Sequence, residues 1–304
     1  MSGVALERTS VGADTEAGRR RGLPWWVDLP ALGGWSLGFA LIVVLGLSGG
    51  GYDAVVRGEA GIAAWWIAGA GVALGSLALP HRGIALYAVA AFAALTVWTA
   101  LGLSWTGSTE RTTAEIARTC GYLGMFVLSV LICVRTPARH IVGGVATGLV
   151  VIGGYALLTR LQPDWFETYA LNDIFPMARR RLAQPVGYWN ALAGLLAIGV
   201  PLLLFYATTG RRIVTRAAAA AAVPVLVVAV FLTVSRGGTV AVGAAVAVWL
   251  VLAPDRLPKI PVLATVAVGA AVGCLAADDL NALQAGVDTA LAEQQGAHLQ
   301  TTLL

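Results

Sequence analysis

Residues 187–207 read GYWNALAGLLAIGVPLLLFYA, a run that contains no charged side chain. A helix needs roughly 20 mostly apolar residues to cross a lipid bilayer, so this run is long enough to span one. Similar apolar runs recur along the chain, separated by short polar segments that carry most of the charge. The sequence therefore predicts an all-α fold, a polytopic transmembrane bundle of about nine spans. The expected spans are residues 31–48, 61–79, 84–103, 119–134, 141–159, 187–207, 217–234, 239–253 and 260–276.

The overall composition agrees with a membrane protein. Hydrophobic residues make up 58% of the 304 and charged residues 12%, whereas a soluble domain has roughly 45–50% and about 25%. The net charge is +4, but the basic residues are spread over many loops and form no single stripe. We therefore expect no nucleic-acid partner, since nucleic-acid binding needs a clustered basic surface.

The chain divides into three segments of different character. Residues 1–22 are polar, lack helical periodicity and end in three arginines, which predicts a disordered cytoplasmic tail. Residues 23–276 form the predicted transmembrane domain. Residues 277–304 are interpreted as an amphipathic segment on the outer face, with apolar positions at Leu280, Leu283, Val287 and Leu291. The first apolar run is full length, so we expect it to direct insertion without a separate signal peptide.

The distribution of arginine and lysine predicts the orientation. With the N-terminus inside and nine crossings, twelve of the twenty basic residues lie in inside segments, as the positive-inside rule favours. Half of the other eight are Arg179, Arg180, Arg181 and Arg236. These four lie at two outer positions, where they break the rule. We expect a multi-pass plasma-membrane protein whose longest outer loop is residues 160–186.

The two outer arginine positions predict an anion site. Arg179, Arg180 and Arg181 lead into the span at 187–207, and Ser235 and Arg236 lie between the next two spans. Guanidinium groups offer planar paired donors to phosphate oxygens and stay charged. A helix N-terminus adds backbone donors, so all these groups could bind one phosphate. The alternative is that the arginines reach lipid phosphates and cap helix ends.

Other conspicuous residues have structural interpretations. Asn190 lies one turn into its span and can bond either a neighbouring helix or the same ligand. Glycine pairs four residues apart predict close helix packing, at Gly34 and Gly38, Gly71 and Gly75, and Gly144 and Gly148. Most tryptophans, among them Trp189, are interpreted as anchors at the membrane surface. Cys120, Cys133 and Cys274 are expected to be apolar packing residues, and we expect no metal or cofactor.

Two motifs together resemble the signatures of the O-antigen ligase and O-antigen polymerase superfamily. The first is matched by Arg181, Gly187, Tyr188, Asn190, Ala191 and Ala193, and the second by Thr233, Ser235, Arg236 and Gly237. A weaker third similarity is the stretch from Trp98 to Trp105. The resemblance covers roughly residues 85–255.

The resemblance implies a metal-independent membrane glycosyltransferase with a glycosyltransferase C-like fold. Members of the superfamily take a glycan from a polyprenyl pyrophosphate lipid at the outer face of the bacterial plasma membrane and pass it to an acceptor glycan. By resemblance, Arg181, Arg236, Asn190 and Ser235 would bind the pyrophosphate, with Arg179 and Arg180 as possible auxiliary residues. The sequence does not separate a ligase from a polymerase.

The chain departs from the superfamily pattern at its C-terminal end. The family continues into a large outer loop with a further Arg and a His that is proposed to assist the acceptor hydroxyl. The context of His298 does not match that loop, so no catalytic base is assigned. We therefore expect a truncated enzyme. Two other classes stay open, a transporter or flippase of an anionic lipid-linked substrate and a non-catalytic membrane protein.

Overall fold

The structure is a computed structural model, which describes residues 29–80, 83–166, 180–280 and 290–303. Within these ranges the regular structure is entirely helical. The predicted tail at 1–22 lies outside the described residues, as does Arg179. The α-helices are α1 (Leu29–Leu47), α2 (Ala54–Ala73), α3 (Ile84–Leu101), α4 (Thr109–Arg135), α5 (Arg139–Leu161), α8 (Trp189–Thr209), α9 (Ile213–Leu232), α10 (Arg236–Leu252), α11 (Ile260–Asp278) and α13 (Ala290–Leu303). Short 3-10 turns lie at Gly49–Gly51, Gly102–Ser104, Pro163–Trp165 and Leu257–Lys259.

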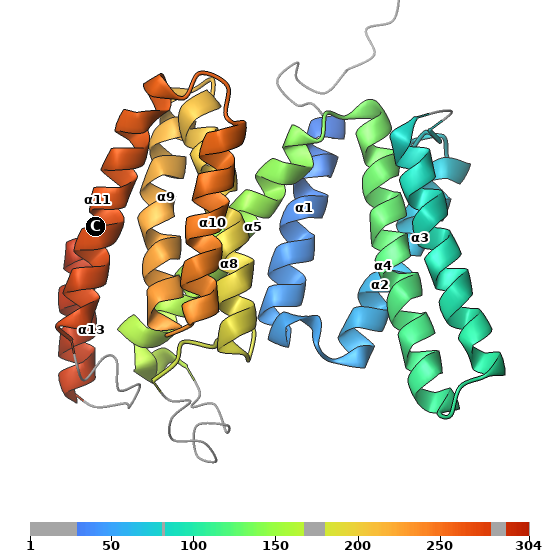
Figure 1. Ribbon diagram of the computed structural model, residues 1–304, viewed down its shortest axis with the longest axis horizontal. Coiled ribbons are helices and arrows are strands. Elements are labelled where there is room, and N and C mark those ends of the chain that lie inside the picture. The colour runs from blue at the N-terminus through green and yellow to red at the C-terminus, as the bar shows by residue number, and fades with distance from the viewer. Residues whose placement is uncertain (1–28, 81–82, 167–179, 281–289, 304) are drawn as a thin grey trace, which may run out of the picture.

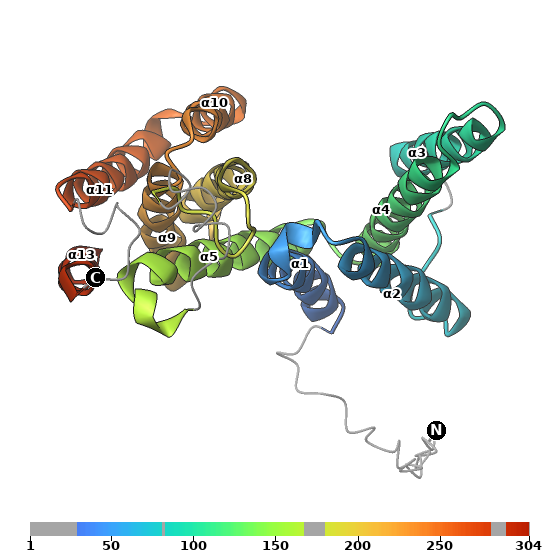
Figure 2. The same cartoon turned by 90° about the horizontal axis from the view of Figure 1, so that it is seen from below.

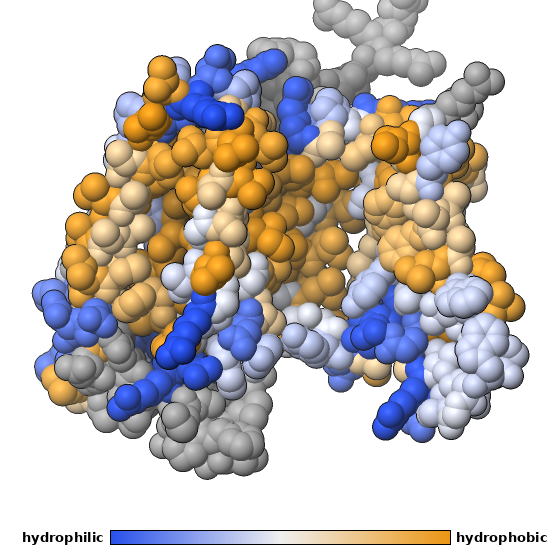
Figure 3. Space-filling view, viewed as in Figure 1, coloured by the Kyte–Doolittle hydropathy of each residue, from blue (hydrophilic) through white to orange (hydrophobic). Residues whose placement is uncertain are grey.

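Seven helices in the described ranges are long and apolar enough to cross a membrane, namely α1, α3, α4, α5, α8, α9 and α11. Helix α10 is apolar but has only 17 residues. The helix α3 has no buried residue although nearly all of its side chains are apolar. In the space-filling view, apolar residues cover the middle of the molecule and hydrophilic residues gather at its upper and lower edges (Figure 3). The chain is therefore a multi-pass membrane protein.

Two helices have bounds that differ clearly from the expected spans. The span expected at 61–79 is the helix α2, which begins at Ala54 because the Asp53 carboxylate accepts hydrogen bonds from the amides of Val55 and Val56. It ends at Ala73, where Gly75 turns the chain with a φ of 69°. Helix α4 begins ten residues before the span expected at 119, since polar residues continue the helix beyond the apolar run.

The helices form two groups that share α1 and α5 (Figures 1 and 2). One group contains α2, α3 and α4, and the other contains α8, α9, α10, α11 and α13. The helix α5 runs diagonally across the larger group (Figure 1), in contact with α1, α8 and α9. Its buried side chains join those of α8 and α9 in the main apolar core, which includes Ile152, Leu196 and Leu226.

Glycines bring α1 and α5 into close contact, as expected for Gly38, Gly144 and Gly148. A Cβ at Gly144 would lie 1.9 Å from the carbonyl oxygen of Trp35, and one at Gly38 would lie 2.2 Å from that of Ile141. The same prediction is wrong for Gly71 and Gly75. Gly71 contacts the nearby Leu77 side chain, and Gly75 lies in the turn after α2. Spacing alone does not distinguish a helix crossing from a turn.

The helix α13 lies within residues 277–304, which the sequence predicts to form an amphipathic segment on the outer surface. It packs against α5 and α11, and Leu299 is completely buried. A Cβ at Gly296 would lie 2.3 Å from the Leu161 carbonyl oxygen at the end of α5. Residues 290–303 therefore form part of the packed bundle. Leu283 and Val287 of the predicted apolar face lie outside the described residues.

Candidate functional site

The two arginine-containing motifs meet at one end of the bundle. This end, called the site end below, is formed by the connection into α8 and by the turn between α9 and α10, at the lower edge of Figure 1. The amide of Leu182 donates a hydrogen bond to the carbonyl of Leu232 at 2.9 Å. Leu182 and Val186 are buried, so the segment that precedes α8 is held against the end of α9.

A tight turn leads from this segment into α8. The amide of Gly187 donates to the carbonyl of Ala183 at 2.8 Å, and Gly187 has a φ of 85°. A residue with a Cβ would be strained in this conformation, which explains a glycine at this position of the motif. The helix then begins at Trp189, so Tyr188, Trp189 and Asn190 lie at its first turn.

The turn between α9 and α10 is fixed by its own hydroxyl groups. The amide of Ser235 donates to Thr233 Oγ1 at 3.2 Å, and the amide of Gly238 donates to Ser235 Oγ at 3.0 Å. Thr233 and Ser235 are both buried. Between them, Val234 has a φ of 52°, which is unfavourable for a β-branched residue. A residue in such a backbone conformation must be held in place by the structure around it. Residues of this kind cluster at functional sites.

A side-chain hydrogen bond joins the two motifs directly. Ser235 Oγ donates to Asn190 Oδ1 at 2.8 Å, across 45 positions of the sequence. Asn190 Nδ2 in turn donates to the Tyr188 hydroxyl oxygen at 2.8 Å. Close packing reinforces the pairing, since a Cβ at Gly238 would lie 2.4 Å from that of Ala193. Asn190 and Ser235 therefore position the two motifs against each other. Whether they also bind a ligand stays a prediction.

Arg181 lies over the aromatic ring of Trp189. Its guanidinium carbon is 4.8 Å from the ring centroid, within the range of a cation–π contact. The indole Nε1 of Trp189 is buried and has no hydrogen-bond partner within the described part of the chain. The sequence predicts that Trp189 anchors the helix at the membrane surface. In the structure, the ring of Trp189 also contacts Arg181, an arginine of the candidate site.

Arg236 is the first residue of α10 and has an exposed side chain, as does Arg180. Neither has an ion-pair or hydrogen-bond partner among the described residues, and the ion pair between Arg118 and Glu115 lies elsewhere, within α4. The Arg181 and Arg236 backbones are brought to the same end of the bundle by the Leu182–Leu232 and Asn190–Ser235 contacts. The separation of their guanidinium groups, expected to be within about 15 Å given side-chain reach, stays a prediction.

The arrangement is suited to binding an anion at the membrane surface. Arg236 has an exposed side chain at the N-terminus of α10, where backbone amides and the helix dipole attract negative charge. No group of three or more His, Cys, Asp or Glu residues in the described ranges is placed to hold a metal ion.

Several neighbouring residues contribute to the site in ways that the motifs alone do not indicate. Tyr188 and Thr233 match the motifs without a predicted role, and Gly238 lies outside them. Their hydrogen bonds and close contacts hold the two motifs together. The signal in the sequence that could have pointed to these three residues is that each lies close in sequence to a predicted site residue. Contacts across 45 positions cannot be read from the residues alone.

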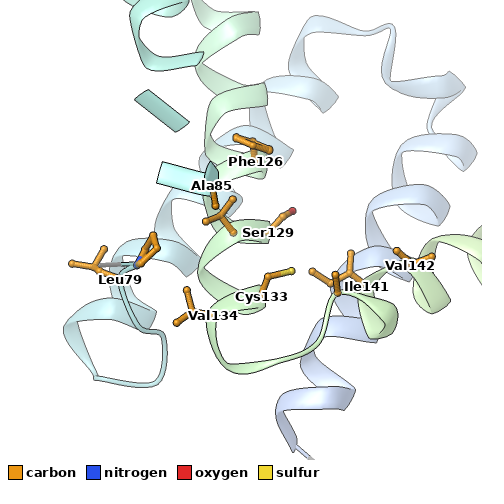
Figure 4. Close-up of a pocket in the computed structure, with 11 residues that line it drawn as sticks. Leu79, Ala85, Phe126, Ser129, Cys133, Val134, Ile141 and Val142 are labelled. Carbon is orange, nitrogen blue, oxygen red and sulfur yellow. The ribbon is translucent and has the colours of Figure 1, made fainter. Parts of the chain in front are cut away.

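An apolar cavity lies away from the candidate site, where α3 and α4 face the start of α5 (Figure 4). Its volume is about 580 Å³, and Phe126, Ile141 and Val142 line it together with Ser129 and Cys133. No charged side chain lines it. Cys120, Cys133 and Cys274 are all free thiols, and Cys133 is exposed toward this cavity.

Comparison of the chain with family models, with curated proteins and with solved structures found no match.

Proposed function

We propose that this chain is a membrane glycosyltransferase of the O-antigen ligase and polymerase type, which binds a polyprenyl pyrophosphate-linked glycan at the outer face of a bacterial plasma membrane. The observation that carries the proposal is the hydrogen bond from Ser235 to Asn190, since it unites the two motifs that resemble that superfamily. The acceptor would be another glycan of the cell envelope.

The proposed roles follow from the chemistry of each side chain. Arg181 and Arg236 bind the two phosphate groups, and Arg179 and Arg180 add positive charge nearby. When the sugar is transferred, negative charge develops on the leaving pyrophosphate, and fixed guanidinium groups stabilise it. Trp189 contacts the Arg181 guanidinium group through its ring and helps to hold it in place. Asn190 and Ser235 position both motifs.

The proposal includes nine spans and a cytoplasmic N-terminus. Seven helices are long and apolar enough to cross a membrane, and α2 and α10 would bring the number of spans to nine. In Figure 1 successive helices from α1 to α11 run alternately down and up, as expected for repeated crossings. An inside N-terminus then places the site end outside the cell. A glycosyltransferase C-like arrangement is part of the same proposal.

Binding of a polyprenyl pyrophosphate tests the proposal. The purified chain in nanodiscs is titrated with undecaprenyl pyrophosphate, and Arg236→Gln is compared with Arg211→Gln, a matched loss of charge at the opposite end of the bundle. We expect Arg236→Gln to weaken binding by about 1.5–3 kcal/mol, the scale of a hydrogen bond to a charged group. Equal affinity for the wild type and both variants would contradict the proposed site.

A further inference from the structure

A large groove runs between α8 and α10 and is separate from the candidate site. Its volume is about 940 Å³, at the upper end of the range of ligand pockets, roughly 300–1,000 Å³. The walls are almost entirely apolar. Small residues of α10, Ala241, Ala244 and Ala245, leave space beside the larger Leu202 and Phe205 of α8.

The groove extends from the site end toward the opposite end of the bundle. The two helices touch where Gly238 meets Ala193, and the groove begins just beyond that contact, at Gly194 and Ala241. From Ala241 to Leu252 the helix rises about 16 Å at 1.5 Å per residue. This length is close to one leaflet of the hydrocarbon core, about 15 Å. The groove therefore has the length of a lipid tail.

Positive charge lies at one end of the groove only. Arg139 and Lys259 are the charged residues that line it, and both lie at the end opposite the candidate site. Arg236 and Asn190 do not line it. The connections at that same end also carry Arg211, Arg212 and Arg256, whereas Asp255 is the acidic residue of the α10–α11 connection. The Arg139 side chain is exposed and has no ion-pair partner in the described ranges.

We propose that this groove binds an anionic phospholipid, whose phosphate headgroup contacts Arg139 and Lys259 and whose acyl chain lies between α8 and α10. Basic pockets between membrane helices are suited to such headgroups. The contact between Gly238 and Ala193 closes the groove toward the site end, which favours entry of the chain from the charged end. The inference goes beyond the proposed function and does not depend on it.

Lipid retention after purification tests the proposal. The wild-type chain is exchanged into detergent with dioleoylphosphatidylglycerol or dioleoylphosphatidylcholine, and bound lipid is counted by native mass spectrometry. We expect one tightly held phosphatidylglycerol and little phosphatidylcholine. The double variant Arg139→Gln/Lys259→Gln should weaken retention about tenfold or more. The control Arg211→Gln/Arg212→Gln removes the same charge at the same end without altering the groove, and should retain the lipid.

A second pair of variants tests the acyl chain separately from the charge. Ala245→Phe fills the groove and should release the lipid, whereas Ala247→Phe, at a position of the same helix that does not line the groove, should not. Elution as a single species in size-exclusion chromatography shows that each variant is folded. Equal loss in both charge variants would mean diffuse surface attraction and would overturn the proposal. Retention that depends on Arg236 but not on Arg139 and Lys259 would also overturn it, and would assign the groove to a lipid held at the candidate site.

Discussion

The hydroxyl of Ser235 donates a hydrogen bond to the Oδ1 atom of Asn190 at 2.8 Å, and the same hydroxyl accepts the amide hydrogen of Gly238 at 3.0 Å. One buried oxygen thus caps α10 and ties it to the first turn of α8. The two motifs are held in a fixed relation before any ligand is bound. This relation has consequences for both stability and binding.

The Ser235–Asn190 pair should behave as a coupled unit. Ser235→Ala removes a helix cap, worth about 1 kcal/mol, and a side-chain hydrogen bond, worth about 0.5–1.5 kcal/mol. Asn190→Ala removes only side-chain hydrogen bonds and should cost less. In the double variant the shared bond is lost only once, so the two free-energy changes should not add. Unfolding in detergent measures all three, and strict additivity would show that the bond contributes nothing.

The crossing of α1 and α5 should not tolerate a larger residue at Gly144. A Cβ there would lie 1.9 Å from the Trp35 carbonyl oxygen, so Gly144→Ala should destabilise the protein by about 1–3 kcal/mol through overpacking. Gly154 lies on the same helix, and a Cβ added there would have no neighbouring atom within 4 Å. Gly154→Ala is the matched control and should be neutral or stabilising. Thermal unfolding of both variants decides between these outcomes, and equal effects would argue against the close crossing.

The orientation can be tested with single cysteines in a chain whose three native cysteines are replaced. Gly107→Cys lies in the α3–α4 connection at the site end, and Arg211→Cys lies in the α8–α9 connection at the opposite end. We expect an impermeant maleimide to label position 107 in intact cells and position 211 only after permeabilisation. The reverse pattern would place the candidate site in the cytoplasm and remove the basis for a substrate at the outer face.

Glycan transfer by this chain should not depend on His298. Transfer needs a group that activates the acceptor hydroxyl, and no described residue of the site has been assigned that role. His298 is exposed on α13, and we expect His298→Ala to change neither lipid binding nor transfer. The assay is transfer from a polyprenyl pyrophosphate-linked glycan in nanodiscs. Robust transfer that His298→Ala abolishes would instead make His298 the base.

The sequence predicted the existence of the helices better than their ends. Long apolar runs such as that of α8 identify a span because each residue adds to the same signal. The ends of α2 depend on the Asp53 cap and the turn at Gly75, and the first part of α4 is too polar to be part of an apolar run. Hydropathy alone does not report such local hydrogen bonds and turns.

The candidate site was predicted as two positions on adjacent spans, but not as a connected structure. Arginine at two helix ends indicated an anion site, whereas the bond between Asn190 and Ser235 depends on how α8 and α10 pack. For Trp189, an indole at the start of a span fits an anchor at the membrane surface as well as it fits a contact with an arginine of the site. Its contact with Arg181 follows from the fold of the segment before α8, which no periodic pattern predicts.

The central claim is that Arg181 and Arg236 bind one pyrophosphate together. A double-mutant cycle on undecaprenyl pyrophosphate affinity, with Arg181→Gln, Arg236→Gln and the double variant in nanodiscs, tests it most directly. We predict that each single variant weakens binding about tenfold or more, and that the double variant loses less than the two free-energy changes combined, because the arginines share a ligand. Single variants that leave affinity unchanged, or two losses that add without coupling, would contradict a shared site.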